Sequence, residues 1–254
     1  MRDTSLPEPD AVRIAMWSGP RNLSTAMMRS FGNRADTAVV DEPLYAAYLR
    51  ATGLDHPARE QILASQDDDW RVVTAALTGP VPGRRRIYYQ KHMTHHLLPD
   101  MGRDWLGQVT NAFLIREPAG VVASYAKVRG TPTVQDLGFS QQVEIFRACA
   151  DRSGQAPAVV DAADLLADPE RVLRLLCQRL GVGFDPAMLS WPAGPRASDG
   201  VWAPHWYAAV QTSTGFARPA FAGTSPPVPE HLLDLLERCR PCYQELAAYR
   251  LGRA

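Results

Sequence analysis

The chain has 254 residues, of which 46% are hydrophobic and 21% are charged, and its 27 lysines and arginines equal its 27 aspartates and glutamates. This composition is typical of a globular protein with a full core. The zero net charge argues against a nucleic-acid-binding or membrane-binding surface, because both need clustered excess cations. The cysteine spacing does not favour a redox or metal site, and we expect a cytoplasmic location. At this length we expect a single domain over residues 1–254. Residues 1–11 are polar and predict a flexible tail without a signal peptide.

The first predicted element is a strand over residues 12–17, followed by a Ser-Gly-Pro turn and a helix that Asn22 or Ser24 could cap. A strand, a tight turn and a helix N-terminus form an anion site, because unpaired N–H groups converge there and the helix dipole favours negative charge. Arg21 adds a permanent cation, and Ser24 and Thr25 add hydroxyl donors. An ordinary turn with a surface arginine is the alternative. The residues predicted to bind phosphate here are Gly19, Arg21, Asn22, Ser24 and Thr25.

Further strands alternate with helices along the chain, which predicts an α/β fold with a three-layer parallel sheet and helices on both faces. Ligands of such sheets lie beyond the carboxyl ends of the strands. Residues 185–228 are rich in Pro, Gly and Ser and predict a loop-rich cover over the site. The predicted strands are 37–40, 86–90, 109–115 and 158–160, and the predicted helices are 44–51, 58–64, 70–77, 118–128, 139–153, 169–180 and 230–250.

A second anion-binding pattern begins at Arg116, which closes the fourth predicted strand. Ser124 follows about two turns into the next predicted helix. A guanidinium offers two parallel donors to a phosphate, and the hydroxyl supplies a third. The alternative is an arginine that binds backbone carbonyls beside a routine serine.

These two patterns resemble the 5′-phosphosulfate loop and the 3′-phosphate motif of sulfotransferases. The first is Arg-x-x-Ser-Thr at 21–25, and the second is Arg-Glu-Pro followed by Ser at 116–124. The resemblance implies a P-loop-like fold and 3′-phosphoadenosine 5′-phosphosulfate (PAPS) as donor. It also implies transfer of a sulfuryl group to a hydroxyl or amine of a small-molecule or carbohydrate acceptor, without a metal. A looser resemblance at the Gly-x-Trp of 200–202 implies that Arg196 contacts the 3′-phosphate.

The general base has two candidate positions in this comparison. Glu42-Pro-Leu is similar to the segment that carries a proposed glutamate base in bacterial and carbohydrate sulfotransferases. The Lys-Thr-His of the cytosolic branch appears only as Lys-His-Met at 91–93, with two more histidines close behind. We predict that Glu42, in preference to His95, is the base. We expect Glu42 to end a strand that is adjacent to the one leading into the Arg21 loop. We expect Asp41 to turn toward the following helix. The histidine alternatives are His92, His95 and His96.

Two other function classes stay open. Asp41 and Glu42 end an apolar strand that is similar to a Walker B strand, which would indicate a P-loop kinase or ATPase that holds Mg²⁺. The missing Gly-Lys of the P-loop argues against that class. Leu23 stands where the sulfotransferase loop commonly has glycine, which leaves a non-catalytic nucleotide-binding protein of the same fold as the other alternative. The sequence also leaves the oligomeric state open, a homodimer included.

Overall fold

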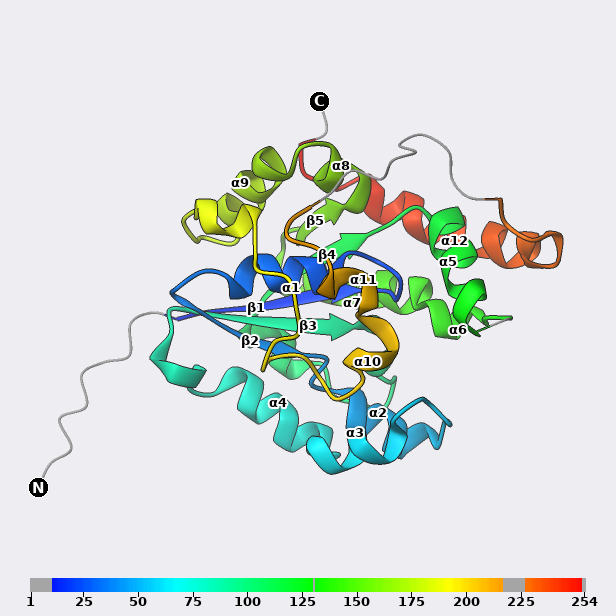
Figure 1. The fold of residues 1–254 in the computed structure, drawn as a ribbon, viewed down its shortest axis with the longest axis horizontal. Helices are drawn as coiled ribbons and strands as arrows, with labels where there is room; N and C mark the ends of the chain where they lie inside the picture. Colours follow the sequence, from blue (N-terminus) through cyan, green and yellow to red (C-terminus); the bar gives the residue numbers. More distant parts are fainter. Residues whose placement is uncertain (1–10, 130, 217–226, 253–254) are drawn as a thin grey trace, which may run out of the picture.

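A computed structural model describes residues 11–129, 131–216 and 227–252. In this part of the chain, five parallel strands form one sheet in the order β2-β3-β1-β4-β5, flanked by helices (Figure 1). The predicted α/β class, the five predicted strands and the parallel sheet are confirmed. The strands are β1 (Val12–Ser18), β2 (Thr37–Asp41), β3 (Ile87–Met93), β4 (Thr110–Ile115) and β5 (Ala158–Asp161).

Outside the predicted loop-rich cover, the described helices follow the predicted pattern, with two additions that the sequence reading missed. The first addition, α6, begins at a reciprocal cap between Thr133 and Asp136, inside the segment expected to be a loop. The second, α8, is capped by the Asp161 carboxylate, which accepts from the Ala163 N–H. The helices are α1 (Ser24–Gly32), α2 (Tyr45–Thr52), α3 (Arg59–Ser65), α4 (Trp70–Thr78), α5 (Pro118–Arg129), α6 (Val134–Leu137), α7 (Phe139–Ser153), α8 (Ala162–Ala167), α9 (Pro169–Arg179), α10 (Ala203–Trp206), α11 (Ala208–Gln211) and α12 (Leu233–Ala247). Shorter 3₁₀ turns are η1 (Pro82–Arg84), η2 (Thr94–His96), η3 (Asp104–Gln108), η4 (Pro186–Leu189) and η5 (Glu230–Leu232).

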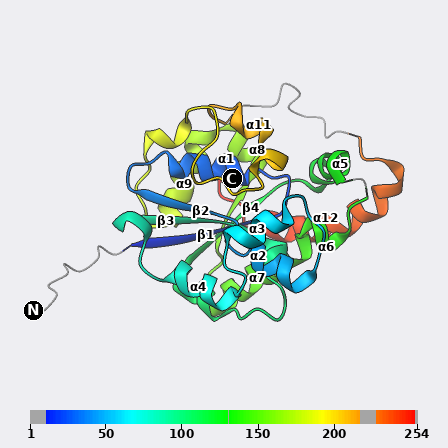
Figure 2. The ribbon, with the colours of Figure 1, turned by 60° about the horizontal axis from the view of Figure 1, so that its bottom comes forward.

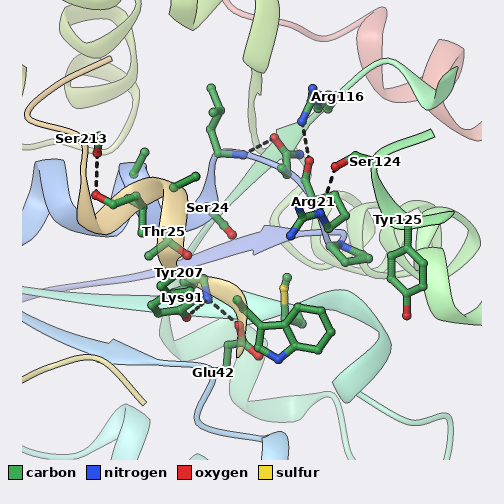
Figure 3. Close-up of a pocket in the computed structure, with 18 of the residues that line it drawn as sticks. Arg21, Ser24, Thr25, Glu42, Lys91, Arg116, Ser124, Tyr125, Tyr207 and Ser213 are labelled. Atoms are coloured by element: carbon green, nitrogen blue, oxygen red, sulfur yellow. Dashed lines mark hydrogen bonds and ion pairs between the residues drawn. The ribbon is translucent and has the colours of Figure 1, made fainter. Parts of the chain in front are cut away.

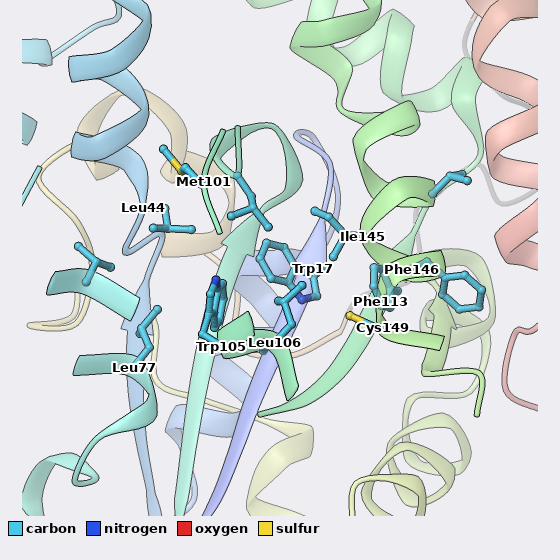
Figure 4. Close-up of a cluster of buried hydrophobic side chains, with 14 of the residues drawn as sticks. Trp17, Leu44, Leu77, Met101, Trp105, Leu106, Phe113, Ile145, Phe146 and Cys149 are labelled. Carbon is cyan, nitrogen blue, oxygen red and sulfur yellow. The ribbon is translucent and has the colours of Figure 1, made fainter. Parts of the chain in front are cut away.

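Two of the apolar clusters of the described hydrophobic core lie on the two faces of the sheet. Strand β1 serves both, since Trp17 belongs to one cluster and Met16 to the other. A strand buried on both faces reads as a continuous apolar run, which explains the pattern at 12–17. Helices α4 and α7 cover one face, and α1 and α9 cover the opposite face (Figure 2). Figure 4 shows the first cluster, where Trp17, Trp105 and Phe113 pack side by side.

The strand order corrects one prediction about the site. We expected β2 beside β1, but β3 lies between them and pairs with both. The chain between β2 and β3 runs through α2, α3 and α4 before it returns to the middle of the sheet, and the sequence does not reveal such a return. As a result, the carboxyl end of β3 lies between Glu42 and the Arg21 turn.

The segment expected to cover the site is largely irregular where the structure describes it. Residues 185–216 contain three short helical turns, η4, α10 and α11, separated by loops. The remainder of that prediction, at 217–226, lies outside the described residues, as does most of the expected N-terminal tail. None of the described helices combines the length and the apolar character that crossing a bilayer requires.

Candidate active site

A cavity of about 430 Å³ lies at the carboxyl ends of the central strands (Figure 3). Its lining begins with residues 20–26, which form the turn after β1 and the start of α1. The other lining residues are Glu42, Tyr45, His56, Lys91, Met93, His95, His96, Arg116, Ser124, Tyr125, Leu166, Trp206, Tyr207, Ala209, Val210, Ser213, Gly215 and Phe216. The structure therefore brings both predicted anion-binding patterns and the predicted base to one cavity.

The turn after β1 is held in place by Asn22. Its side-chain amide donates to the carbonyl of Leu114 at 2.9 Å, and its side-chain oxygen accepts from the N–H of Leu23 at 2.8 Å. The predicted cap was wrong, because Leu23 is the N-cap residue of α1 and this end of the helix has no side-chain capping hydrogen bond among the described residues. The N–H groups of its first turn remain available to an anion at the cavity, where the predicted Ser24 and Thr25 also lie.

Gly19 has a packing role beside this turn. It does not line the cavity. A Cβ at Gly19 would lie 2.7 Å from the carbonyl oxygen of Leu137, closer than a real Cβ contact. Glycine therefore lets the turn pack directly against the end of α6.

The two arginines of the predicted motifs are in direct contact. Arg21, which has a left-handed φ of 55°, donates from Nε to the Ser124 hydroxyl at 3.0 Å. Arg116 donates from Nη1 to the Arg21 carbonyl at 2.6 Å. Burial and the neighbouring Arg21 charge lower the pKa of Arg116. Two cations so close together favour a ligand with more than one negative charge.

On the opposite side of the cavity, Lys91 joins the predicted base to Asp41. The Lys91 ammonium donates to Asp41 at 2.8 Å, to Glu42 at 2.5 Å and to the Tyr207 hydroxyl at 2.8 Å. The expectation that Asp41 turns toward α2 was wrong, because Asp41 faces this ammonium. In Figure 3 the hydroxyls of Ser24 and Thr25 lie between this group and the arginine pair.

Glu42 has the environment of a carboxyl with a displaced pKa. It is buried, and its φ of 42° lies in the left-handed region, where a residue other than glycine is strained. Burial raises the pKa of Glu42, and the Asp41 charge raises it further, while Lys91 acts in the opposite direction. A carboxyl with a raised pKa is a stronger base once it has ionised.

The three histidines divide into one core residue and two cavity residues. His92 stacks on Trp17 at 4.4 Å, does not line the cavity, and has its pKa lowered to about 3 by burial. His95 and His96 line the cavity. Burial lowers the pKa of His95 to about 4 and holds that of His96 well below 6.5, so both rings are neutral at pH 7. The His96 Nδ1 lies 3.9 Å from a Glu42 carboxylate oxygen.

Arg196 is not brought to the cavity. Its backbone N–H donates to Asp199 at 2.8 Å, and the same carboxylate oxygen pairs with the buried Arg29 at 2.7 Å. Gly200, the residue after Asp199, donates its N–H to Asp41 at 3.1 Å. The segment that resembles the family's nucleotide cover is thus fixed to the Asp41–Lys91 pair, and its arginine lies elsewhere.

The sequence reading did not predict the contacts of Lys91 and Tyr207 with Asp41, and it took Tyr207 only as an aromatic residue of either the acceptor cleft or the core. Lys91 carried a signal, because a lysine within an otherwise buried strand needs a charged partner. The contact of Tyr207 with Asp41 carried no signal, since it joins residues 166 positions apart.

Known proteins resemble the chain over almost its whole length. The family model of the sulfotransferase domain matches residues 12–250. Branched-chain-amino-acid aminotransferase-like protein 1 of Arabidopsis thaliana is 40% identical over 243 residues, which are 95% of this chain and 42% of that protein. The related protein 2 is 37% identical over 237 residues, which are 93% of this chain and 41% of that protein. The chain thus spans less than half the length of these relatives.

One solved structure shows a similar fold. The sulfotransferase from Alicyclobacillus acidocaldarius superposes with a TM-score of 0.50 at 11% sequence identity. The match covers 94% of this chain and 96% of that one. At this identity the likeness concerns the fold alone.

Proposed function

Given that the chain belongs to the sulfotransferase family, we propose that it transfers the sulfuryl group of PAPS to a hydroxyl or amine of a small-molecule or carbohydrate acceptor. The observation that carries the proposal is the contact between the two arginine motifs at the cavity. Arg21 reaches Ser124, and Arg116 reaches the Arg21 backbone, so both motifs form one cationic surface. PAPS carries an anionic group at each of two ribose positions, which such a surface can bind together.

In this proposal the donor lies along the turn at 20–26. The N–H groups at the start of α1, with Arg21, Asn22, Ser24 and Thr25, bind the 5′-phosphosulfate. Arg116 and Ser124 bind the 3′-phosphate. Arg196 has no part in donor binding here, because it does not line the cavity.

The reaction breaks one sulfur–oxygen bond of the donor and forms a bond from sulfur to the acceptor oxygen or nitrogen. The acceptor oxygen or nitrogen attacks sulfur, its proton passes to the Glu42 carboxylate, and the bond from sulfur to the 5′-phosphate oxygen breaks. The leaving adenosine 3′,5′-bisphosphate gains negative charge at that oxygen. Arg21 and the N–H groups of α1 stabilise this charge, so the transfer needs no metal ion.

The acceptor side of the cavity has aromatic and neutral walls. Tyr45, Trp206 and the neutral rings of His95 and His96 lie there. The nearby Lys91 already donates to three protein oxygens, so it offers no spare donor to an acceptor anion. These features support an uncharged or amine-bearing acceptor over a carboxylated or phosphorylated one.

The contacts of Asp41 argue against the kinase or ATPase alternative. One of its oxygens accepts from Lys91 and the other from the Gly200 N–H, and the Tyr207 hydroxyl contacts both. A Walker B aspartate needs an oxygen open to Mg²⁺ or to its water. The geometry therefore favours the family's sulfuryl transfer.

The test is to incubate the protein with PAPS and sets of neutral alcohols, phenols, sugars and amines, and to measure release of adenosine 3′,5′-bisphosphate by chromatography. We expect acceptor-dependent release that Glu42→Gln suppresses. Nucleotide binding without release for every acceptor class would instead support a non-catalytic protein of this fold. Phosphoryl transfer from ATP with Mg²⁺ would support a kinase.

A further inference from the structure

Two carboxylates share the buried ammonium of Lys91, although one would balance its charge. The Lys91 side chain is 1% exposed, and each of its three N–H groups has an acceptor. Two of these acceptors are the carboxylates of Asp41 and Glu42, and the third is the neutral Tyr207 hydroxyl. The group therefore carries one surplus negative charge whenever both carboxylates are ionised.

The two carboxylates are held very differently. Asp41 accepts from Lys91, from the Gly200 N–H at 3.1 Å and from the Tyr207 hydroxyl at 2.7 Å, so both of its oxygens are occupied. Tyr207 is itself fixed, because its hydroxyl also accepts from the Trp202 indole at 3.1 Å. Glu42 has one oxygen on Lys91, and among the described residues its other oxygen has no hydrogen-bond partner. The Nδ1 atom of His96 lies 3.9 Å from that oxygen, beyond hydrogen-bond distance.

From this difference we infer that Asp41 is a positioning residue for the transfer: it neutralises Lys91, so the free oxygen of Glu42 can take up and later release the acceptor proton. The inference rests on the proposed function only in naming the proton's source. If Lys91 had Glu42 as its sole partner, the two would form a stable ion pair. A carboxylate in such a pair binds a proton poorly at neutral pH.

The electrostatics of the group point the same way. Burial raises the pKa of Glu42, the Lys91 charge lowers it, and the Asp41 charge raises it. The other titratable groups around Glu42 are His96, His95 and Tyr207, and the burial of each favours its neutral form near pH 7. Beside the effect of burial, the charges of Asp41 and Lys91 therefore set how readily Glu42 is protonated.

The experiment measures the protonation of Glu42 directly, without turnover. Protein labelled with ¹³C at the glutamate side-chain carboxyls is titrated by NMR, and the Glu42→Gln spectrum assigns the Glu42 signal. Asp41→Asn should lower the pKa of Glu42 by about one pH unit or more, because a negative neighbour is lost. Lys91→Gln should raise it. Tyr207→Phe, the matched control, removes hydrogen bonds but no charge. It should shift the pKa of Glu42 by less than half as much as Asp41→Asn does.

Opposite shifts in the first two variants would establish Asp41 as the residue that sets the Glu42 charge. Shifts in the same direction, or an equal shift in Tyr207→Phe, would overturn the inference, because loosened packing moves the pKa of Glu42 toward its ordinary value in every variant. If Asp41→Asn does not fold, Lys91→Gln decides alone, and an unchanged or lowered pKa contradicts the inference. A protein that titrates as expected but transfers no sulfuryl group would refute the proposed function and leave the charge arrangement intact.

Discussion

The Nε of Arg21 donates to the hydroxyl of Ser124 at 3.0 Å, a contact between two residues 103 positions apart that joins the two predicted motifs. One motif follows β1 and the other follows β4, and the two strands are neighbours in the sheet. Adjacent parallel strands bring their carboxyl ends to the same edge, so sheet pairing alone makes the motifs one surface. A ligand with two anionic groups can then contact both motifs at once.

The first prediction concerns the 3′-phosphate contact. Arg116→Ala should weaken binding of adenosine 3′,5′-bisphosphate by about 2–4 kcal/mol, because a charged donor pair is lost. Ser124→Ala should cost less, since its hydroxyl is uncharged. Calorimetric titration measures both, with Arg116→Lys as the control that keeps the charge and loses the forked geometry. Unchanged binding in Arg116→Ala, together with a lower melting temperature, would show that Arg116 only supports the Arg21 turn.

The second prediction concerns the base. Glu42→Gln keeps the shape of the side chain and can still accept from Lys91, but it cannot take a proton. It should lower kcat by about 10² to 10⁴ and leave donor binding within about twofold. His95→Asn is the comparison variant, measured with the same acceptor. Normal turnover in Glu42→Gln with a dead His95→Asn would move the base to the histidine.

The site could be predicted in part, because some of its signals are local in sequence. The Arg21 turn and the Arg116–Ser124 helix start each follow a strand that the apolar pattern marks. The Lys91–Asp41 pair could not be predicted, because it depends on β3 returning to lie beside β2. For Arg196, in contrast, a short local motif indicated a ligand contact that the cavity lining does not include. Tertiary packing places this residue beside Asp199.

A third prediction follows from the buried ring of His92. Its pKa is lowered to about 3 in the folded protein, whereas an unfolded histidine takes up a proton near pH 6.5. Folding stability is therefore full above pH 6.5 and falls as the pH drops from 6.5 toward 3, since the unfolded state binds the extra proton. His95 and His96 act in the same direction.

Denaturant unfolding at pH 7 and pH 5 measures this slope. His92→Phe keeps the stacking on Trp17 and should make the slope shallower by up to about 1.4 kcal/mol per pH unit. His205→Gln, at an exposed position, serves as the control for removing a histidine. An identical slope in His92→Phe and the parent protein would show that His92 does not resist protonation in the folded state.

The fourth prediction is that transfer does not depend on divalent metal. The leaving phosphate oxygen is stabilised by Arg21 and by the N–H groups of α1, which are present without any ion. Activity with PAPS should therefore survive EDTA. Activity that disappears in EDTA and returns with Mg²⁺ would make Asp41 a metal ligand and would revive the kinase alternative.

The most direct test of the central claim is calorimetric titration of the protein with adenosine 3′,5′-bisphosphate, AMP and ATP under one set of conditions. The three ligands share the adenosine and differ in where their phosphates lie. We predict micromolar affinity for the bisphosphate and at least about tenfold weaker binding of AMP and of ATP, a difference of about 1.4 kcal/mol. Equal affinity for AMP and the bisphosphate, or tighter binding of ATP, would contradict a 3′-phosphate site at Arg116 and Ser124.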